Sequence, residues 1–394
     1  MKRFVNNQLM IKETIILTVF FISLLLSGGC DRKVEIQASG KIIKMGIIGP
    51  FSGEDRAKGL DGIKGIKTAL ILSPLVRNGD KIELFIEDDK NEPSLTLSAL
   101  NRLVTEEQVS AIILMSTSAS ALEIRSRANE LQIPVLAMLA AHPDVTKDND
   151  FISQLCFDNV IQGTVAALFV MDELLLDRVA VFTNPDSKNS TTLATEFIKK
   201  YQSVGGDVTD TVLVQEGVDY RNKLEDLRDK GTELLYLPVK AKSLIKIIKV
   251  AEEMNWHPEI MGSDGLVATV ITDYEEDTDL LQGLYAIDIF SQSEAIIERA
   301  SWLQKISKTY KERYGEQGTS YAALGFEGYM VIQNAMNRCN DPGNRICINR
   351  QLRNTKNFAG LASNISINEK GKASRPLIVN TIKNGKMEFI VKVY

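Results

Sequence analysis

Short apolar runs alternate with longer amphipathic segments from Lys41 to the end of the chain. Apolar runs bounded by polar turns are typical of buried strands, and apolar residues at helical spacing are typical of amphipathic helices. The first half predicts strands at Ile42–Ile48, Ile82–Ile86, Ala111–Met115 and Val135–Met138, with helices at Gly59–Leu75, Ser94–Thr105 and Ala119–Leu131. This series favours a parallel sheet covered by helices on both faces.

A second series of the same kind begins near residue 159. It predicts strands at Arg178–Thr183, Val208–Val214, Leu234–Leu237, Glu259–Met261 and Leu284–Phe290, and helices at Thr191–Tyr201, Tyr220–Arg228, Ala241–Met254, Ile296–Tyr314 and Thr319–Asn337. Strands near 364–368, 376–383 and 386–392 close the chain. No Pro- or Gly-rich linker separates the two series, so we expect two α/β lobes between which the chain crosses more than once. Doubly wound sheets bind ligands beyond the carboxyl ends of their strands, and two facing lobes would form a cleft that closes by hinge motion.

The N-terminus has the pattern of a targeting segment. Its basic residues come first: Lys2, Arg3 and Lys12. The uncharged apolar run Thr14–Leu26 is short for a membrane span, which needs about 20 residues, but it suits a signal peptide. Ser27-Gly28-Gly29-Cys30 then resembles a bacterial lipobox, which predicts a signal peptide at 1–29 and a lipid on Cys30. An uncleaved membrane anchor is the alternative.

Composition argues against several classes of function. The 394 residues carry 46 Lys plus Arg and 51 Asp plus Glu, a net charge of −5 without the basic excess of a general nucleic-acid binder. Two histidines and four scattered cysteines offer little material for a metal site. No nucleotide-binding, zinc-protease or nucleophile-elbow motif occurs. We therefore expect no enzyme, no metal and no cofactor. Asp88-Asp89 ends a strand and is interpreted as a turn and helix cap rather than an acid–base pair.

The cysteines divide into three groups if the chain is exported. Cys339 and Cys347 flank a polar segment with turn residues, which favours a local disulfide in an oxidising compartment. Cys156 lies in a strand-like pattern and is expected to be a buried free thiol, although its pairing with another cysteine stays open.

Small polar loops follow several predicted strands. Gly49–Gly53 and Ser116-Thr117-Ser118 each precede a helix, and free N–H groups and hydroxyls there could bind an anion. Gly262–Gly265 brings one carboxylate, Asp264, to the corresponding end of the second lobe. Together these groups would suit a zwitterion. Ordinary helix capping is the alternative interpretation of each loop.

Seven segments in register resemble the type I periplasmic binding proteins, in particular the branched-chain amino-acid-binding branch of ABC transporters. They are KMGIIGPFSG, IEDDKNEP, AIILMSTSAS, IPVLAMLAAHPDVT, GSDG, YAALGFEGY and NFAGLASNISINEKGK. The resemblance implies two doubly wound parallel-sheet lobes joined by three crossovers, with a ligand cleft between them. It assigns 30–40 to the anchor and linker, 41–158 plus 287–378 to lobe 1, and 159–286 plus 379–394 to lobe 2.

The resemblance also implies roles for individual residues. Ser118, with Ser116 and Thr117 in the same loop, falls on the position that contacts the ligand carboxylate. Ala140 falls on a backbone carbonyl that accepts from the ligand ammonium. Ala141 stands where the family has Thr or Ser, so a hydroxyl is lost and the N–H remains. Asp264 falls on the acidic residue that pairs with the ammonium.

Other positions depart from the family. Asn159 replaces an aspartate, Asn189 replaces a tyrosine, and Tyr321 matches an aromatic near the cleft. Lys58 and Lys240 each stand where an aromatic residue is common. If both lysines face the cleft, they predict a ligand with an extra acidic group, because buried lysines need partners. The alternative is that both are solvated.

The leading hypothesis is an extracytoplasmic, membrane-anchored lipoprotein. It would capture an amino acid or related carboxylate by cleft closure and deliver it to an ABC transporter permease. A sensor that presents its occupancy to a membrane receptor is one alternative, and a binding protein that has drifted to a non-amino-acid ligand is another.

Overall fold

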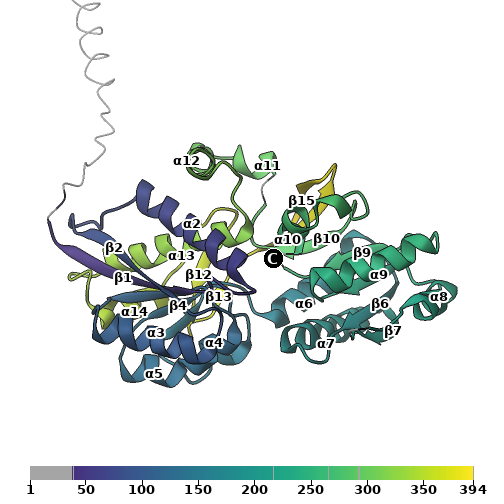
Figure 1. Ribbon diagram of the computed structural model, residues 1–394, viewed down its shortest axis with the longest axis horizontal. Coiled ribbons are helices and arrows are strands. Elements are labelled where there is room, and N and C mark those ends of the chain that lie inside the picture. Colours follow the sequence, from purple (N-terminus) through teal and green to yellow (C-terminus); the bar gives the residue numbers. More distant parts are fainter. Residues whose placement is uncertain (1–37, 39, 216, 265, 292, 394) are drawn as a thin grey trace, which may run out of the picture. The chain divides into compact units, whose positions relative to one another are not determined.

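Strands and helices alternate along the chain as the hydrophobic pattern predicts, and the strands form two large sheets and one small one (Figure 1). The computed structural model describes residues 38 and 40–393, apart from 216, 265 and 292. The predicted signal peptide and Cys30 lie outside the described residues. Residues 38–394 group together as one compact unit.

The first sheet has five parallel strands in the order β2-β1-β3-β4-β5. They are β1 (Ile42–Gly49), β2 (Lys81–Asp88), β3 (Ala111–Leu114), β4 (Val135–Ala137) and β5 (Ile152–Gln154). One face carries α3 (Pro93–Thr105), α4 (Ser118–Glu123) and α5 (Arg125–Glu130), and the other carries α2 (Arg56–Leu72) and α13 (Ser320–Asn337) (Figure 1). Successive β1 residues point to opposite faces of the sheet, since Ile47 belongs to the apolar cluster that contains Ile63 of α2, and Ile48 to the cluster that contains Leu100 of α3.

The second sheet has seven strands in the order β15-β14-β10-β9-β8-β6-β7. They are β6 (Arg178–Thr183), β7 (Asp207–Leu213), β8 (Leu234–Leu237), β9 (Glu259–Gly262), β10 (Tyr285–Asp288), β14 (Leu377–Lys383) and β15 (Lys386–Val393). The helices that precede or connect them are α6 (Asn159–Leu168), α7 (Lys188–Ser203), α8 (Arg221–Asp229), α9 (Ala241–Glu253) and α10 (Leu266–Asp273). Val181 belongs to the apolar cluster that contains Phe197 of α7, and Phe182 to the cluster that contains Leu244 of α9, so both faces are again buried.

The two sheets repeat one topology. Numbered from their own first strands, β2-β1-β3-β4-β5 and β7-β6-β8-β9-β10 share the order 2-1-3-4-5. In such sheets the strand order reverses between the first and third strands, and ligands bind outside the carboxyl ends at that point. In the first sheet the loops after β1 and β3 lie there, and in the second sheet the loops after β6 and β8.

The chain passes between the two sheets three times. After β10 it returns to α13, which packs on α2 and β3, and β14 then rejoins the second sheet. The returning segment holds α11 (Glu294–Ile297), α12 (Ser301–Tyr314), α14 (Arg345–Arg353) and the small sheet β11 (Phe358–Ala359), β12 (Asn364–Ile367) and β13 (Ala373–Ser374). The predicted lobe boundaries 286/287 and 378/379 fall inside β10 and β14. Both strands belong entirely to the second sheet, so these two boundaries are wrong by a few residues.

Some predicted elements differ from the observed ones. The helix predicted at Ala119–Leu131 is interrupted at Ile124, and that predicted at Ile296–Tyr314 is interrupted before Ala300, whose backbone is extended. Helix α2 ends at Leu72 rather than Leu75 because Pro74 follows, and a residue before proline disfavours helix. Helices α6, α10 and α14 were absent from the prediction.

The cysteine region also differs from expectation. The sulfur atoms of Cys339 and Cys347 are 2.06 Å apart, a disulfide. The segment between them is not only a loop, because α14 begins at Arg345 and Asn344 caps it by accepting a hydrogen bond from Cys347 N at 2.9 Å. Cys156 is a buried free thiol that lies in the turn after β5 rather than in a strand. Burial raises the pKa of this thiol to about 12.

Helices α2 and α13 touch at their backbones. A Cβ atom placed on Gly65 would lie 1.9 Å from the carbonyl oxygen of Ala322, and one on Gly325 would lie 2.0 Å from that of Gly62. Only glycine permits this approach, because a backbone carbonyl cannot move aside as a side chain can. The contact fixes the start of α2, which carries Lys58, against the start of α13, which carries Tyr321.

A buried ion pair joins two of the passages between the sheets. Arg375, just before β14, donates to Glu327 of α13 at 2.6 and 3.1 Å and to the carbonyl of Ile289 at 3.5 Å. Glu327 also accepts from Leu361 N at 2.8 Å. Both charged side chains are almost fully buried, at 0% and 2% exposed. The pair therefore ties the segment after β10 and the segment before β14 to the same helix.

Candidate functional site

The loop after β1 is held in place by the end of β2. Asp88 accepts hydrogen bonds from the backbone N–H groups of Phe51 and Ser52 at 2.9 and 3.3 Å and from the Ser52 hydroxyl at 2.5 Å. Although some burial acts to raise its pKa, these donors hold the pKa of the Asp88 carboxyl below its usual value. Asp88 and Asp89 lead into the turn at Lys90-Asn91, as predicted, but neither caps α3, whose N-cap is Glu92. Asp88 instead braces the loop after β1.

The loop after β3 is tied to the same turn. The Ser116 hydroxyl donates to Asp89 at 2.6 Å, and Thr117 donates to Asn91 from its N–H at 2.9 Å and from its hydroxyl at 2.8 Å. The expectation that these groups are free donors for an anion is therefore wrong for Ser116 and Thr117. Buried polar groups satisfy one another where they can, and here the partners come from a loop distant in sequence.

Ser118 and the loop after β4 form the next part of the edge. The Ser118 hydroxyl accepts from His142 N at 3.2 Å, which leaves its own proton available to a ligand carboxylate. The Ala140 carbonyl accepts from Gln154 Nε2 at 2.5 Å, so one of its two acceptor positions is used. Asn159, the first residue of α6, donates its N–H to the Ala141 carbonyl at 3.4 Å. The structure thus brings Ala141 and Asn159 together.

Asp264 follows β9 and is exposed. The surrounding protein raises the pKa of its carboxyl by desolvation, while Gln162 and Lys58 act in the opposite direction. Its charge in turn adds to the effect of burial in raising the pKa values of Tyr236 and Tyr321. Groups from α2, α6, β8 and α13 therefore lie around this one carboxylate.

A second carboxylate lies deeper in the same region. Asp288 ends β10, is buried, and accepts from the Ser320 hydroxyl of α13 at 2.8 Å. Desolvation raises the pKa of Asp288 to about 7, and the charge of Asp264 adds to this. Tyr321, beside Ser320, is half-buried and its pKa is raised by burial and by both carboxylates. Tyr321 and Asp264, both predicted site residues, are therefore neighbours.

Both lysines singled out from sequence have carboxylate partners. Lys58 Nζ lies 2.9 Å from Asp55, and Lys240 Nζ lies 3.4 Å from Glu54. Burial acts to raise the pKa of Asp55, but Lys58, the hydrogen bond from Asn91 and the charge of Lys240 hold it below its usual value. The extra-acid prediction requires both lysines to be buried in the cleft without partners, whereas Lys58 is 38% exposed, Lys240 is 82% exposed and each has a carboxylate partner.

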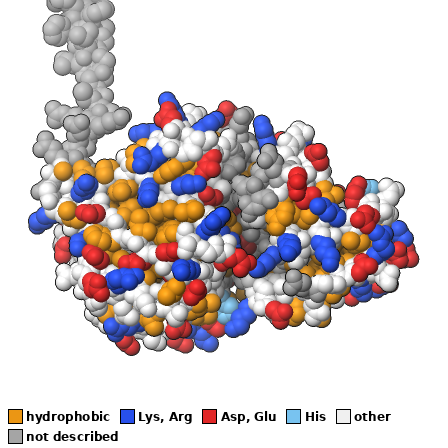
Figure 2. Space-filling model, viewed as in Figure 1, with side chains coloured by type: hydrophobic (Ala, Val, Ile, Leu, Met, Phe, Trp, Pro, Cys, Tyr) orange, Lys and Arg blue, Asp and Glu red, His pale blue; other side chains and the backbone are white. Residues whose placement is uncertain are grey.

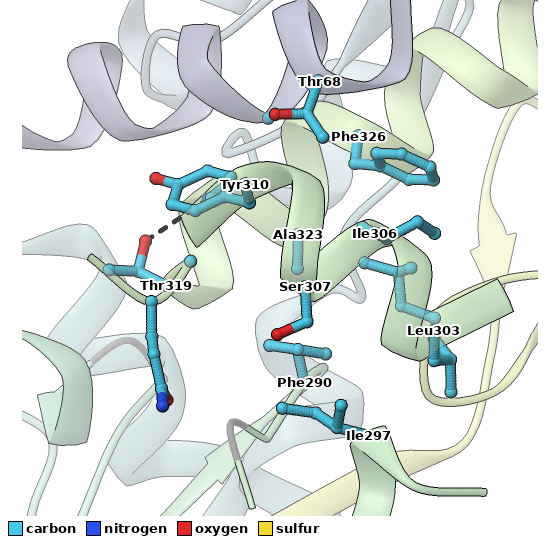
Figure 3. Close-up of a pocket in the computed structure, with 15 residues that line it drawn as sticks. Thr68, Phe290, Ile297, Leu303, Ile306, Ser307, Tyr310, Thr319, Ala323 and Phe326 are labelled. Atoms are coloured by element: carbon cyan, nitrogen blue, oxygen red, sulfur yellow. Dashed lines mark hydrogen bonds between the residues drawn. The ribbon is translucent and has the colours of Figure 1, made fainter. Parts of the chain in front are cut away.

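Two cavities, lined mainly by side chains of α2, α12 and α13, lie away from these residues. One, about 50 Å³, lies beneath α12 and is lined mainly by apolar side chains such as Leu303, Ile306 and Phe326 (Figure 3). The other, about 350 Å³, shares Ile306, Phe326 and Leu361 with it. Neither contains a predicted ligand residue; the first has no charged lining residue, whereas Lys305 and Glu327 line the second.

Three further observations concern the surface, metal ligands and membrane-spanning helices. Figure 2 shows acidic and basic side chains interspersed over α8 and α9, and hydrophobic ones gathered over α2 and its neighbours. Within 40–393 and outside the undescribed positions, no group of three or more His, Cys, Asp or Glu residues could hold a metal ion. In the same part of the chain, no helix is both long and apolar enough to cross a membrane.

Several residues around the candidate site were not predicted from the sequence. Glu54, Asp55 and Asn91 pair with residues that were predicted, but no local pattern reveals partners so far apart in sequence. Gln162 could have been identified as a polar residue on the mainly apolar buried face of α6, where Asn159 is the other polar one. Tyr236 could also have been identified, because it is a tyrosine in the buried run Leu234–Leu237 and its hydroxyl needs a partner inside the core.

Two sheets of 2-1-3-4-5 order, joined by a chain that passes between them three times, define the type I periplasmic binding protein fold. The chain belongs to the periplasmic binding protein family, whose sequence pattern it matches over residues 42–386. The family and fold predicted from sequence are thus confirmed. Members of this class bind solutes rather than convert them.

Known structures and a curated relative support this assignment. A leucine-binding protein from Thermotoga maritima is 28% identical with a TM-score of 0.76, and the match covers 89% of this chain and 98% of that one. A branched-chain amino acid transporter substrate-binding protein from Streptococcus pneumoniae, solved with isoleucine, shares the fold at 24% identity with a TM-score of 0.77, covering 89% and 100%. An amino acid binding protein of Pseudomonas aeruginosa is 24% identical over 229 residues, 57% of this chain and 61% of the relative's own length.

Proposed function

We propose that this chain is an extracytoplasmic solute-binding protein that captures a small amino-acid-like ligand for an ABC transporter permease. The observation that carries the proposal is the convergence on Asp264 of groups from both halves of the fold. Lys58 starts α2 and Tyr321 starts α13, both on the first sheet, whereas Asp264 follows a strand of the second. A ligand bound by groups of both sheets favours the closed arrangement, because closure depends on differential affinity for that state.

The charges around Asp264 favour a zwitterionic ligand. Lys58 is the basic side chain that acts on Asp264, and it is already paired with Asp55. Lys240 is paired with Glu54, and both of these side chains are largely exposed. The acidic Asp264 therefore suits the ammonium of the ligand, and the hydroxyl of Ser118 suits its carboxylate. A ligand with a second carboxylate would have to displace Asp55 or Glu54.

The proposed location and transport role are supported by the N-terminal sequence and by the family. The lipobox ending in Cys30 favours an anchored lipoprotein on the outer side of a bacterial membrane. The leucine-binding and branched-chain-binding proteins similar to this chain are named for amino acid ligands. A permease that accepts the released solute is the partner we infer.

A thermal-shift screen of residues 38–394 against amino acids, organic acids and aromatic carboxylates tests the proposal. A ligand that binds only the native state stabilises it by about 2.7 kcal/mol at one hundred times its Kd. We expect an amino acid to raise Tm by several degrees, and Asp264→Asn to abolish most of that shift. Asp229→Asn, an exposed change on α8, is the matched control and should leave the shift intact. No shift with any compound would contradict solute binding.

A further inference from the structure

Gln162 has an unusual environment for a buried amide. It lies in the first turns of α6 and is 1% exposed. Neither Nε2 nor Oε1 has a hydrogen-bond partner among the described residues. Buried side-chain amides are nearly always satisfied, and leaving one unpaired costs about 1–3 kcal/mol. We therefore expect the unpaired amide to have a function that offsets this cost.

The unpaired amide lies beside the candidate site. The Gln162 amide lies near enough to Asp264 to act on it as a donor and lower the pKa of that carboxyl, although the two side chains are not within hydrogen-bonding distance. Two further buried polar groups in this region also lack partners in the described part of the chain. One is the hydroxyl of Tyr236, which is fully buried and near enough to feel the charge of Asp264. The other is Oδ1 of Asn159, one helical turn before Gln162. The unsatisfied groups of Gln162 and Tyr236 thus lie near a carboxylate whose residue is exposed.

The chemistry of these groups points to a cation. Asp264 can only accept hydrogen bonds when it is ionised, whereas an amide donates from Nε2 and accepts at Oε1. An ammonium has three N–H donors, which one carboxylate does not satisfy alone. With Nε2 turned to Asp264, Oε1 becomes a second acceptor for the same ammonium. A buried water could also fill the gap, and the test separates these outcomes.

We propose that Gln162 is a ligand-binding residue, whose Oε1 accepts a hydrogen bond from the ammonium of the solute while Nε2 orients Asp264. The inference rests on the proposed function, since it requires a bound amino acid. It predicts that the site distinguishes an amino acid from the same carboxylate without its amine. Gln162 then contributes to specificity rather than to the stability of the empty protein.

The test is calorimetric titration of Gln162→Met with an amino acid and with its desamino analogue, such as leucine and isocaproate. Methionine has similar volume but no amide, so the loss of one hydrogen bond to a charged group is expected to weaken amino acid binding at least about tenfold. Binding of the desamino analogue should not change. The Tm of the ligand-free variant should equal or exceed that of the wild type, because an unpaired amide has been removed.

Gln333→Met is the matched control. Gln333 is an equally buried amide on α13, but its Nε2 donates to the carbonyls of Ser73 and Leu75 at 2.8 and 2.9 Å. This variant should lose stability and keep its affinity for the amino acid. The two variants therefore respond in opposite ways if the assignment is correct.

The remaining outcomes would overturn either the role of Gln162 or the proposed function. Unchanged amino acid binding in Gln162→Met, or equal weakening of both ligands, overturns the role of Gln162. Wild-type protein that binds carboxylates but no amino acid overturns it too, while solute binding itself survives. Wild-type protein that binds neither class contradicts the proposed function, and the inference falls with it.

Discussion

Replacing Arg375 by methionine is expected to remove a large part of the folding free energy of this protein. The side chain is completely buried and donates to both oxygens of Glu327. Methionine fills much of the same space without charge. The variant leaves Glu327 with a buried carboxylate whose remaining donor is Leu361 N at 2.8 Å.

The magnitude follows from the burial of both partners. Breaking a fully buried ion pair by removing one partner costs about 3–5 kcal/mol, because the other charge is left uncompensated. Native domains have unfolding free energies of about 5–15 kcal/mol, so the loss is a substantial fraction of the total. The second substitution Glu327→Gln removes the stranded charge and keeps an oxygen for Leu361 N. The double variant should therefore be more stable than Arg375→Met alone.

Urea unfolding at neutral pH, followed by circular dichroism, measures both effects. The single variant should show a lower midpoint with an unchanged slope, and the double variant should recover part of the loss. A single variant within about 1 kcal/mol of the wild type would refute the reasoning, since surface ion pairs contribute that little. A double variant no more stable than the single one would show that the stranded charge is not the cause.

Three further predictions concern packing and titration. Gly325→Ala should cost about 1–3 kcal/mol in urea unfolding, because its Cβ would meet the Gly62 carbonyl at 2.0 Å, whereas Gly318→Ala, with its nearest contact at 3.4 Å, should cost little. Asp288, with its pKa raised to about 7 in the folded state, gives stability that is full below its unfolded value of 3.8 and is lost as pH rises towards 7. Asp288 contributes at most about 1.4 kcal/mol per pH unit to the slope of the unfolding free energy against pH, and this contribution should disappear in Asp288→Asn. Identical pH profiles of stability for the two proteins would contradict this. The Cys156 thiol, with its pKa raised to about 12, should resist a thiol reagent at pH 8 in native protein and react after unfolding; rapid native labelling would show that it is accessible.

The hydrophobic pattern predicted most of the fold because parallel strands are buried on both faces. Arg178–Thr183 and Leu234–Leu237 are apolar runs whose predicted and observed limits agree. Helix α14 was missed because its start depends on a cap by Asn344 inside a segment rich in turn residues. The break at Ile124 was missed because apolar spacing continues across it. Spacing shows which residues are buried and gives little information about where hydrogen bonding is interrupted.

The candidate site was predictable only in part. Motif positions pointed to Asp264 and Tyr321, and the structure places these two near one another. The partners of Thr117 and Lys58 are Asn91 and Asp55, and the identity of a side chain's partner depends on tertiary packing rather than on local sequence. Two of the donors expected to be free proved to be used within the protein for this reason.

Calorimetric titration of wild-type protein and Asp264→Asn with the amino acid that gives the largest thermal shift tests the central claim most directly. A hydrogen-bonded charge pair to the ligand contributes about 1.5–3 kcal/mol, so the variant should bind at least about tenfold more weakly, with an unchanged fold. Equal affinity in the two proteins, or no binding of any amino acid to the wild type, would contradict the account of Asp264 as the group that captures an amino acid.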